Sequence, residues 1–115
     1  MALELYYKLG PQHEVRRCEH YEVDWAPEAR RVAVDSYGDE DNRVDVSTVF
    51  LPLDHNYTGV GPPLVFETLV FGGTLDEEMR RYATWDEAVA GHQQMCRMVE
   101  ATLLKFGPDS KQEGE

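Results

Sequence analysis

Hydrophobic residues gather in two runs near the middle of the chain, on either side of a loop rich in glycine and proline. The first run covers residues 44–51 (VDVSTVFL) and the second covers residues 64–71 (LVFETLVF). Both runs are rich in β-branched and aromatic residues, and each is about as long as one strand and too short for a typical helix. The pattern therefore predicts a β-hairpin whose strands are joined by residues 52–63.

Shorter runs with strand character predict four further strands, three before the hairpin and one after it. They cover residues 3–9, 13–18, 31–37 and 78–83. The second of them (HEVRRC) is polar enough for an edge strand or a loop beside the first. In the third, Val32 and Val34 fall on one face because side chains alternate along a strand.

Residues 19–30 have the least regular pattern in the chain. A short helical turn fits Val23, Trp25 and Ala26. We expect Pro27 to limit this turn, because proline breaks the hydrogen-bond ladder inside a helix.

The last third of the chain carries a helical pattern that begins with a capping box. In the string TWDE, the Thr84 hydroxyl can accept from the third helical amide while Glu87 reaches back. Apolar or small residues then recur at helical spacing as far as Phe106, and Gly107-Pro108 ends the helix. Residues 107–115 form a polar, acidic tail that we expect to be disordered.

The short connections between the later strands favour an antiparallel meander. The turns at residues 38–43 and 72–77 then lie at one end of the sheet, and the loop 52–63 lies at the other. The helix begins at the loop end, near Asp54 and His55, and runs back across one face. The predicted fold class is α+β: an antiparallel sheet of five or six strands with one long C-terminal helix packed across one face.

The composition agrees with a single globular domain, which we assign to residues 1–106. The chain has 115 residues, and its hydrophobic content of 42% is ordinary for a folded protein. The formal net charge is −11, from 22 acidic and 11 basic residues. This charge repels phosphate groups and so disfavours direct binding to nucleic acids, whereas it suits solubility or a basic protein partner.

The sequence also predicts a cytoplasmic protein. No hydrophobic run approaches the roughly 18 residues that a membrane span needs, and residues 1–10 lack the features of a signal peptide. Cys18 and Cys96 do not have CxxC spacing, so we expect two free thiols. Cys96 fits a small buried hydrophobic position in the helix.

The loop 52–63 is long for a hairpin connection, and loops of this length often carry function. It contains Asp54, His55, Asn56 and Tyr57. An imidazole beside a carboxylate can bind a metal or transfer protons near neutral pH. The alternative is structural, because aspartate and asparagine also cap turns through their own backbone.

Two further polar residues interrupt hydrophobic patterns. Glu67 lies within an apolar strand, and His92 lies within the apolar stripe of the helix. Both are about 10 Å from the loop end of their elements, so they meet if Glu67 points toward the helix. Gly91, beside His92, is unfavourable in a helix and suggests a close approach by another part of the chain.

These residues define a hypothetical metal cluster, since imidazoles and carboxylates are ordinary ligands of divalent metals. Its members are Asp54, His55, Glu67 and His92. In the alternative interpretation, Glu67 pairs with Arg80 or Arg81 on the neighbouring strand, and His92 is a hydrogen-bonded core residue. Strand alternation leaves both interpretations open, because it does not fix the face that Glu67 occupies.

Three strings of the sequence resemble a widespread family of small proteins encoded by bacteriophages and prophages. They are VSTVFLPLDHNY, GPPLVFETLVFGG and RYATWDEAVAGHQQM, which together cover roughly residues 44–98. Pro52 stands where many members have glycine, which stiffens the entrance to the loop. The resemblance implies a shared origin and fold but no mechanism. It draws attention to the polar and aromatic residues inside the strings, which include Trp85.

The sequence contains no GxSxG, HExxH, CxxC or GxxxxGK[ST] motif. We therefore expect a non-enzymatic phage accessory protein that needs no cofactor and binds a host or phage protein, for example as an inhibitor in the host cytoplasm. We also consider a homodimer, which is a common state of small domains.

Two other functions remain open from the sequence. One is a small-molecule or nucleotide binder that uses the loop 52–63 and the helix start, and the other is a metal-dependent hydrolase. The candidate binding residues are Asp54, His55, Asn56, Tyr57, Glu67, Trp85 and His92.

Overall fold

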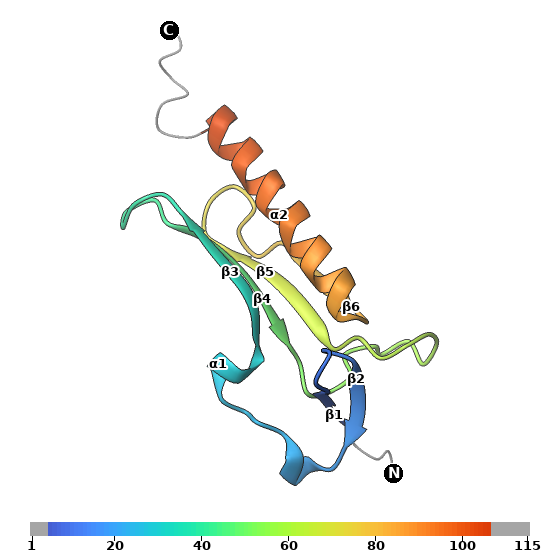
Figure 1. Ribbon diagram of the computed structural model, residues 1–115. Helices are drawn as coiled ribbons and strands as arrows, with labels where there is room; N and C mark the ends of the chain where they lie inside the picture. Colours follow the sequence, from blue (N-terminus) through green and yellow to red (C-terminus); the bar gives the residue numbers. More distant parts are fainter. Residues whose placement is uncertain (1–4, 107–115) are drawn as a thin grey trace, which may run out of the picture.

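The computed structural model describes residues 5–106, and its main body is a four-stranded antiparallel sheet with one long helix on one face (Figure 1). The strands pair in the order β3-β4-β5-β6. Their bounds are Arg31–Tyr37 for β3, Val44–Phe50 for β4, Phe66–Phe71 for β5 and Met79–Tyr82 for β6. The helix α2 covers Trp85–Phe106 and packs against all four strands. The predicted α+β class, the meander and the C-terminal helix are confirmed.

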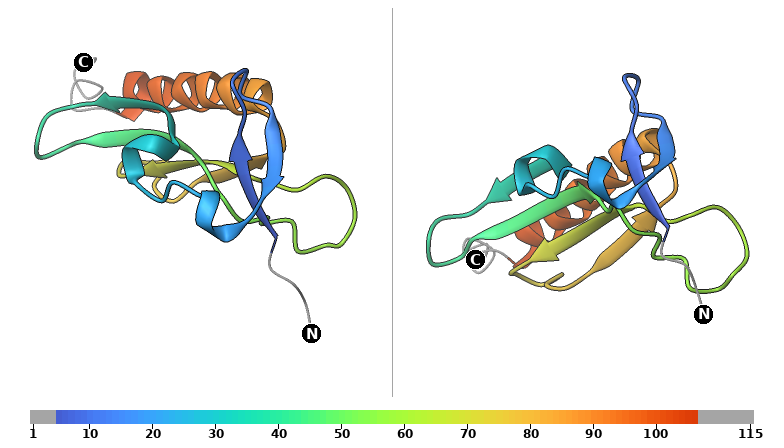
Figure 2. Two further views of the ribbon diagram at one scale, coloured as in Figure 1. Left: turned by 60° about the horizontal axis from the view of Figure 1, so that its bottom comes forward. Right: turned by 90° about the horizontal axis from the view of Figure 1, so that it is seen from below.

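A second, two-stranded antiparallel sheet lies at the loop end of the main sheet (Figure 2). Its strands are β1 (Tyr6–Leu9) and β2 (Val15–Cys18). The Tyr7 amide donates a 2.8 Å hydrogen bond to the Pro52 carbonyl, and Tyr6 forms an isolated bridge with Leu53. The six predicted strands therefore all form, but they are divided between two sheets.

Side chains that face α2 alternate with side chains that face away from it, as the pleat of a strand requires. The buried residues of β4 are Val44, Val46, Thr48 and Phe50. Phe66 and Thr68 of β5 pair with Phe50 and Thr48, and both are buried on the same side. We call this side of the main sheet the inner face and the opposite side the outer face.

The apolar core between the inner face and α2 has two parts. Val46 and Met95 belong to the part beneath the middle and second half of the helix, and Phe66 and Ala88 belong to the part near its start. Residues of the β1–β2 hairpin, among them Tyr7, complete the second part. Burial of these side chains contributes roughly 25 cal/mol per Å² of apolar surface removed from water, which holds the helix to the sheet.

The predicted capping box forms at the start of α2. The Glu87 amide donates to the Thr84 hydroxyl oxygen at 3.1 Å, and the Thr84 amide donates to the Glu87 carboxylate at 3.2 Å. Residues 107–115, for which we predicted a disordered tail, lie outside the described residues. No helix in the described range 5–106 combines the length and hydrophobicity needed to cross a membrane.

Residues 19–30 contain two short helical turns, η1 (His20–Glu22) and α1 (Pro27–Arg30). Pro27 is the first residue of α1, and Ala26 is its N-cap. Proline suits this position because the first helical residue needs no amide donor and its fixed φ is already helical. The prediction that Pro27 limits a turn around Trp25 and Ala26 is therefore wrong, because the turn begins at the proline.

A β-bulge in β3 changes which residues of that strand face the helix. The pairing with β4 shifts register between Arg31 and Ala33. Val32 packs at the margin of the core near the helix start, whereas Val34 is 49% exposed. The prediction that these two valines share one face is wrong, because the extra residue of a bulge breaks the alternation. Asp35 consequently lies on the inner face.

Gly91 of α2 lies against the ring of Tyr82 from β6. A Cβ atom added at Gly91 would come within 2.2 Å of the Tyr82 hydroxyl oxygen and 2.3 Å of two ring carbons. The close approach that the sequence suggested at Gly91 is present. The missing side chain lets the tyrosine pass beside the helix and place its hydroxyl group in the core.

We expect Gly91→Ala to destabilise the protein by about 1–3 kcal/mol, because the added methyl group overpacks the contact with Tyr82. In an unhindered helix the same change would stabilise by about 1 kcal/mol. Urea unfolding of Gly91→Ala, Tyr82→Ala and the double variant measures the coupling between the two sites. If Gly91→Ala alone stabilises the protein, the helix and Tyr82 are not in close contact.

Candidate functional site

Three polar side chains are buried between the main sheet and α2, and they hydrogen-bond to one another. Thr48 and Thr68 are fully buried, and His92 is 4% exposed. The Thr48 hydroxyl oxygen lies 2.5 Å from the Thr68 hydroxyl oxygen and 2.7 Å from His92 Nδ1. These bonds offset the loss of hydration that burial of polar groups entails.

The chain of hydrogen bonds reaches the surface at Asp35 on β3. His92 Nε2 lies 2.8 Å from Asp35 Oδ2, and the Cys96 thiol donates to the same oxygen at 3.5 Å. The Asp35 side chain is 57% exposed. The hydrogen bond from His92 lowers the pKa of Asp35, so this carboxylate is ionised at neutral pH.

One consistent set of donors and acceptors can be assigned to the hydroxyl groups of the network. At its inner end, the Tyr82 hydroxyl donates to the Thr68 hydroxyl oxygen at 3.1 Å. Thr68 can then donate to Thr48, and Thr48 to His92 Nδ1, because each hydroxyl has one proton to give. In this assignment His92 Nδ1 accepts, and the proton on Nε2 points to Asp35. We call this series, from Tyr82 to Asp35, the hydrogen-bond relay.

Thr48, His92 and Asp35 have the residue types of a nucleophile, a base and an orienting acid. In a working triad of this kind the nucleophile is open to substrate and the acid is buried. Here the arrangement is reversed, because the Thr48 hydroxyl is fully buried and the Asp35 carboxylate is exposed. A substrate cannot reach Thr48 without opening the core, so the relay does not have the geometry of a hydrolase.

Cys96 and Glu100 continue the surface end of the relay along α2. The Tyr37 hydroxyl donates to Glu100 Oε2 at 2.8 Å and also interacts with Cys96. Burial raises the pKa of both the Cys96 thiol and the Tyr37 hydroxyl, so both groups are protonated at neutral pH.

One set of metal-ligand atoms comes together in the described part of the chain. It consists of one atom each from Asp35, His92 and Cys96, all within 4.8 Å of one another. This set shares only His92 with the cluster that the sequence suggested.

The loop 52–63 is held together by its own hydrogen bonds. Asp54 Oδ1 accepts from the amides of Asn56 and Leu64 at 2.7 and 2.9 Å. The Asn56 side-chain amide donates to the carbonyls of Val60 and Pro62 at 2.8 and 2.9 Å. Asp54 and Asn56 therefore have the turn-capping role that was the structural alternative for these residues.

The other two candidates in this loop, His55 and Tyr57, lie close to each other. His55 Nδ1 is 2.8 Å from the Leu53 carbonyl oxygen, and the two rings are 5.9 Å apart between centroids. Tyr57 is 79% exposed. Both are placed at the loop end of the sheet, as predicted, but neither contributes to the relay.

Glu67 lies on the outer face of the sheet, because it alternates with the buried Phe66 and Thr68. Its carboxylate accepts from Arg81 Nε on β6 at 3.1 Å, which is the pairing given as the alternative. His92 lies on the inner side. The hypothetical metal cluster of Asp54, His55, Glu67 and His92 therefore does not assemble.

Trp85 joins the helix start to the turn of the β1–β2 hairpin. Its ring stacks on His13 with centroids 3.7 Å apart and meets the Phe66 ring edge-on at 6.2 Å. Its rings thus contact a turn and the core rather than the loop 52–63.

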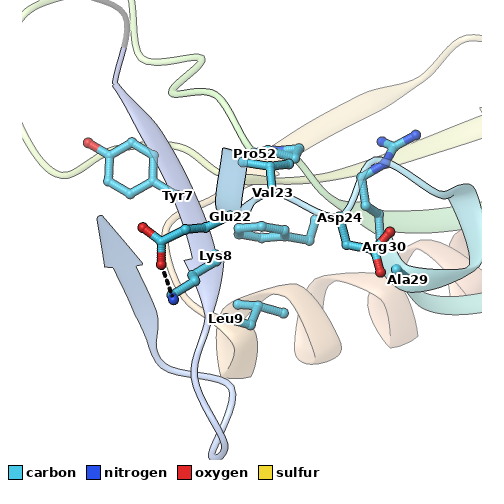
Figure 3. Close-up of a pocket in the computed structure, with 10 residues that line it drawn as sticks. Tyr7, Lys8, Leu9, Glu22, Val23, Asp24, Ala29, Arg30 and Pro52 are labelled. Carbon is cyan, nitrogen blue, oxygen red and sulfur yellow. Dashed lines mark hydrogen bonds and ion pairs between the residues drawn. The ribbon is translucent and has the colours of Figure 1, made fainter. Parts of the chain in front are cut away.

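A hollow of about 270 Å³ lies between β1, the segment around η1 and α1, and the end of β4 (Figure 3). Apolar side chains such as Tyr7, Phe50 and Pro52 line part of it. An ion pair between Lys8 and Glu22, with 2.6 Å between Nζ and Oε1, crosses one side. Of the residues that line the hollow, only Pro52 belongs to the loop 52–63 that the sequence indicated.

The outer face of the main sheet exposes several large apolar side chains. Phe71 is 50% exposed, Val34 is 49% exposed and Met79 is 43% exposed. The register places Val34, Ser47, Leu69 and Met79 in one row across the four strands. Phe71 follows two residues after Leu69 on the same face. We call this row together with Phe71 the outer-face patch.

Sequence reasoning found His92 but missed its partners. Asp35 was missed because the bulge changes the face on which it lies, and no residue of β3 indicates a bulge in the sequence. Thr48 and Thr68 look like ordinary strand residues, although their position opposite each other in adjacent apolar strands was a usable signal.

Comparison of the chain with protein-family models, with curated proteins and with solved structures found no match.

We expect Thr48→Val to destabilise the protein by about 1–3 kcal/mol, because it leaves His92 Nδ1 and the Thr68 hydroxyl without their common partner. Thr74→Val, at an exposed turn position, serves as the control and should change stability by no more than about 0.5 kcal/mol. Urea unfolding measures both. Equal, small effects at the two positions would show that the relay does not stabilise the fold.

Proposed function

We propose that this protein acts without catalysis, by binding a protein partner on the outer face of the main sheet. The observation that carries this proposal is the outer-face patch, where Val34, Phe71 and Met79 are each about half exposed. Exposed apolar side chains that share one face of a sheet are typical of interaction sites, whereas singly scattered apolar residues are not informative.

The charges around the patch indicate the chemistry of the partner. The turn that follows Phe71 carries three exposed acidic residues, Asp76, Glu77 and Glu78. The neighbouring turn, whose Arg43 backbone lies against Gly72, carries three more in residues 39–41. We infer a partner surface that is apolar at its centre and lysine- or arginine-rich at one side, since opposite charges guide association.

The resemblance to phage and prophage proteins suggests where such a partner is found. A small acidic phage protein that binds a host or phage protein would fit both the resemblance and the exposed patch. The reversed burial of Thr48 and Asp35 supports a binding role over hydrolysis. The capped helix start, with Asp86 and Glu87 in its first turn, argues against binding of a nucleotide there.

Replacement of Phe71 and Met79 by serine tests the proposal. We expect the double variant to fold, because both side chains are half exposed, and to lose at least tenfold in partner affinity, since large apolar residues dominate interfaces. Tagged wild-type and variant proteins are incubated with host lysate, and retained proteins are compared by quantitative mass spectrometry.

The matched control is Tyr57→Ser with Val60→Ser, which removes two even more exposed apolar side chains from the loop 52–63. This variant should retain the same partner as the wild type. Loss of the partner in the loop variant alone would place the binding site at that loop. A wild-type dimer in sedimentation that only the Phe71/Met79 variant dissociates would identify a second copy as the occupant.

A further inference from the structure

We propose that Asp35, His92 and Cys96 form a binding site for a thiolate-preferring transition metal ion, with zinc as the natural candidate. The site lies at the boundary between the edge strand β3 and α2, on the side of the sheet opposite to the outer-face patch. It is therefore independent of the proposed binding function, and the two can fail separately.

The backbone places the three ligands from two rigid elements. His92 and Cys96 are four residues apart in α2, so they project from one side of the helix on successive turns. Asp35 reaches them from β3, where the bulge has turned it to the inner face. One ligand atom of each lies within 4.8 Å of the other two.

The distances are close to those of a tetrahedral zinc site. Asp35 Oδ2 lies 2.8 Å from His92 Nε2 and 3.5 Å from Cys96 Sγ. Bonds of about 2.0 Å to nitrogen or oxygen and 2.3 Å to sulfur place tetrahedral ligand atoms roughly 3.3–3.5 Å apart. The Asp35–His92 pair has to open by roughly half an ångström, and the His92 and Cys96 ligand atoms already lie within 4.8 Å of each other. Asp35 can make this movement because its side chain is 57% exposed.

The donor set selects the class of metal. A thiolate, an imidazole nitrogen and a carboxylate together suit zinc and cobalt, whereas magnesium and calcium prefer oxygen ligands alone. Three protein ligands leave a fourth position for water, and the exposed carboxylate leaves that position open to solvent. The net charge of −11 raises the local concentration of cations.

The buried hydroxyl groups provide the outer support that histidine ligands usually have. A metal on Nε2 requires the imidazole proton to be on Nδ1, where Thr48 is 2.7 Å away and can accept it. Thr48 then donates to Thr68, and Thr68 can donate to the Tyr82 hydroxyl oxygen, so the hydrogen bonds of the relay reverse their direction. The ring keeps its orientation in both states, so the core does not have to rearrange when the metal binds.

Cobalt(II) titration of the untagged full chain under reducing conditions tests the site. We expect one Co²⁺ per chain, with visible bands of tetrahedral intensity and a sulfur-to-cobalt charge-transfer band in the near ultraviolet. Zinc should displace the cobalt and abolish both signals. Zinc should also raise the melting temperature, because a ligand that binds only the folded state stabilises it.

Cys96→Ser should abolish the charge-transfer band, and Asp35→Asn should weaken zinc binding at least tenfold. Asp35→Asn keeps the size of the side chain and Cys96→Ser replaces only the sulfur by a smaller oxygen, and circular dichroism and the melting temperature without metal check that both variants fold. Cys18→Ser is the matched control, because Cys18 is the other free cysteine and lies on β2. It should leave the cobalt spectrum unchanged.

Three results would overturn the proposal. The first is that the wild type binds neither cobalt nor zinc at micromolar metal. The second is that the charge-transfer band survives Cys96→Ser, and the third is that this band is lost in Cys18→Ser. In each case the Asp35–His92 contact is only a structural hydrogen bond. None of these results bears on the outer-face patch.

Discussion

The contact between Thr48 and His92 is the interaction on which the arrangement of sheet and helix depends. Apolar packing can hold α2 against the inner face, but it tolerates sliding and rotation, since hydrophobic attraction is not directional. A buried imidazole that needs two hydrogen-bond partners does not tolerate sliding or rotation of the helix, because each lost hydrogen bond leaves a polar group without water or any other partner. His92 bonds to Thr48 on β4 and to Asp35 on β3, so it fixes the helix relative to two strands at once.

Other contacts of the inner face agree with the position of α2 that His92 fixes. Tyr82 supplies the first hydroxyl of the relay only because Gly91 gives its ring room beside the helix. The capping box at Thr84 begins α2 directly after β6, which sets the turn on which His92 lies. The buried polar groups therefore define the geometry within which the apolar side chains pack.

The sequence predicted the strands and the helix well, because their signals are local. Apolar runs of strand length and the string TWDE depend on neighbouring residues only, and the structure agrees with them. The site was less predictable, because it depends on contacts between distant residues. His92 was found as a polar interruption, but its partner Asp35 is 57 positions away and reaches it only through a register shift that local pattern does not reveal. The predicted contact between Glu67 and His92 was wrong for a different reason. The strand β5 carries apolar residues on both faces, so its local pattern does not show which face Glu67 occupies.

The bulge between Arg31 and Ala33 also has a consequence for how the chain could vary. If β3 instead paired regularly from Arg31, which lies opposite Val49, every following side chain of the strand would turn over. Val34 would then lie opposite Val46, where Asp35 now meets His92, and the Asp35 carboxylate would emerge among the apolar side chains of the other surface. The two surfaces of the sheet are therefore linked through one extra residue of β3, and a shift of register there would alter both in one step.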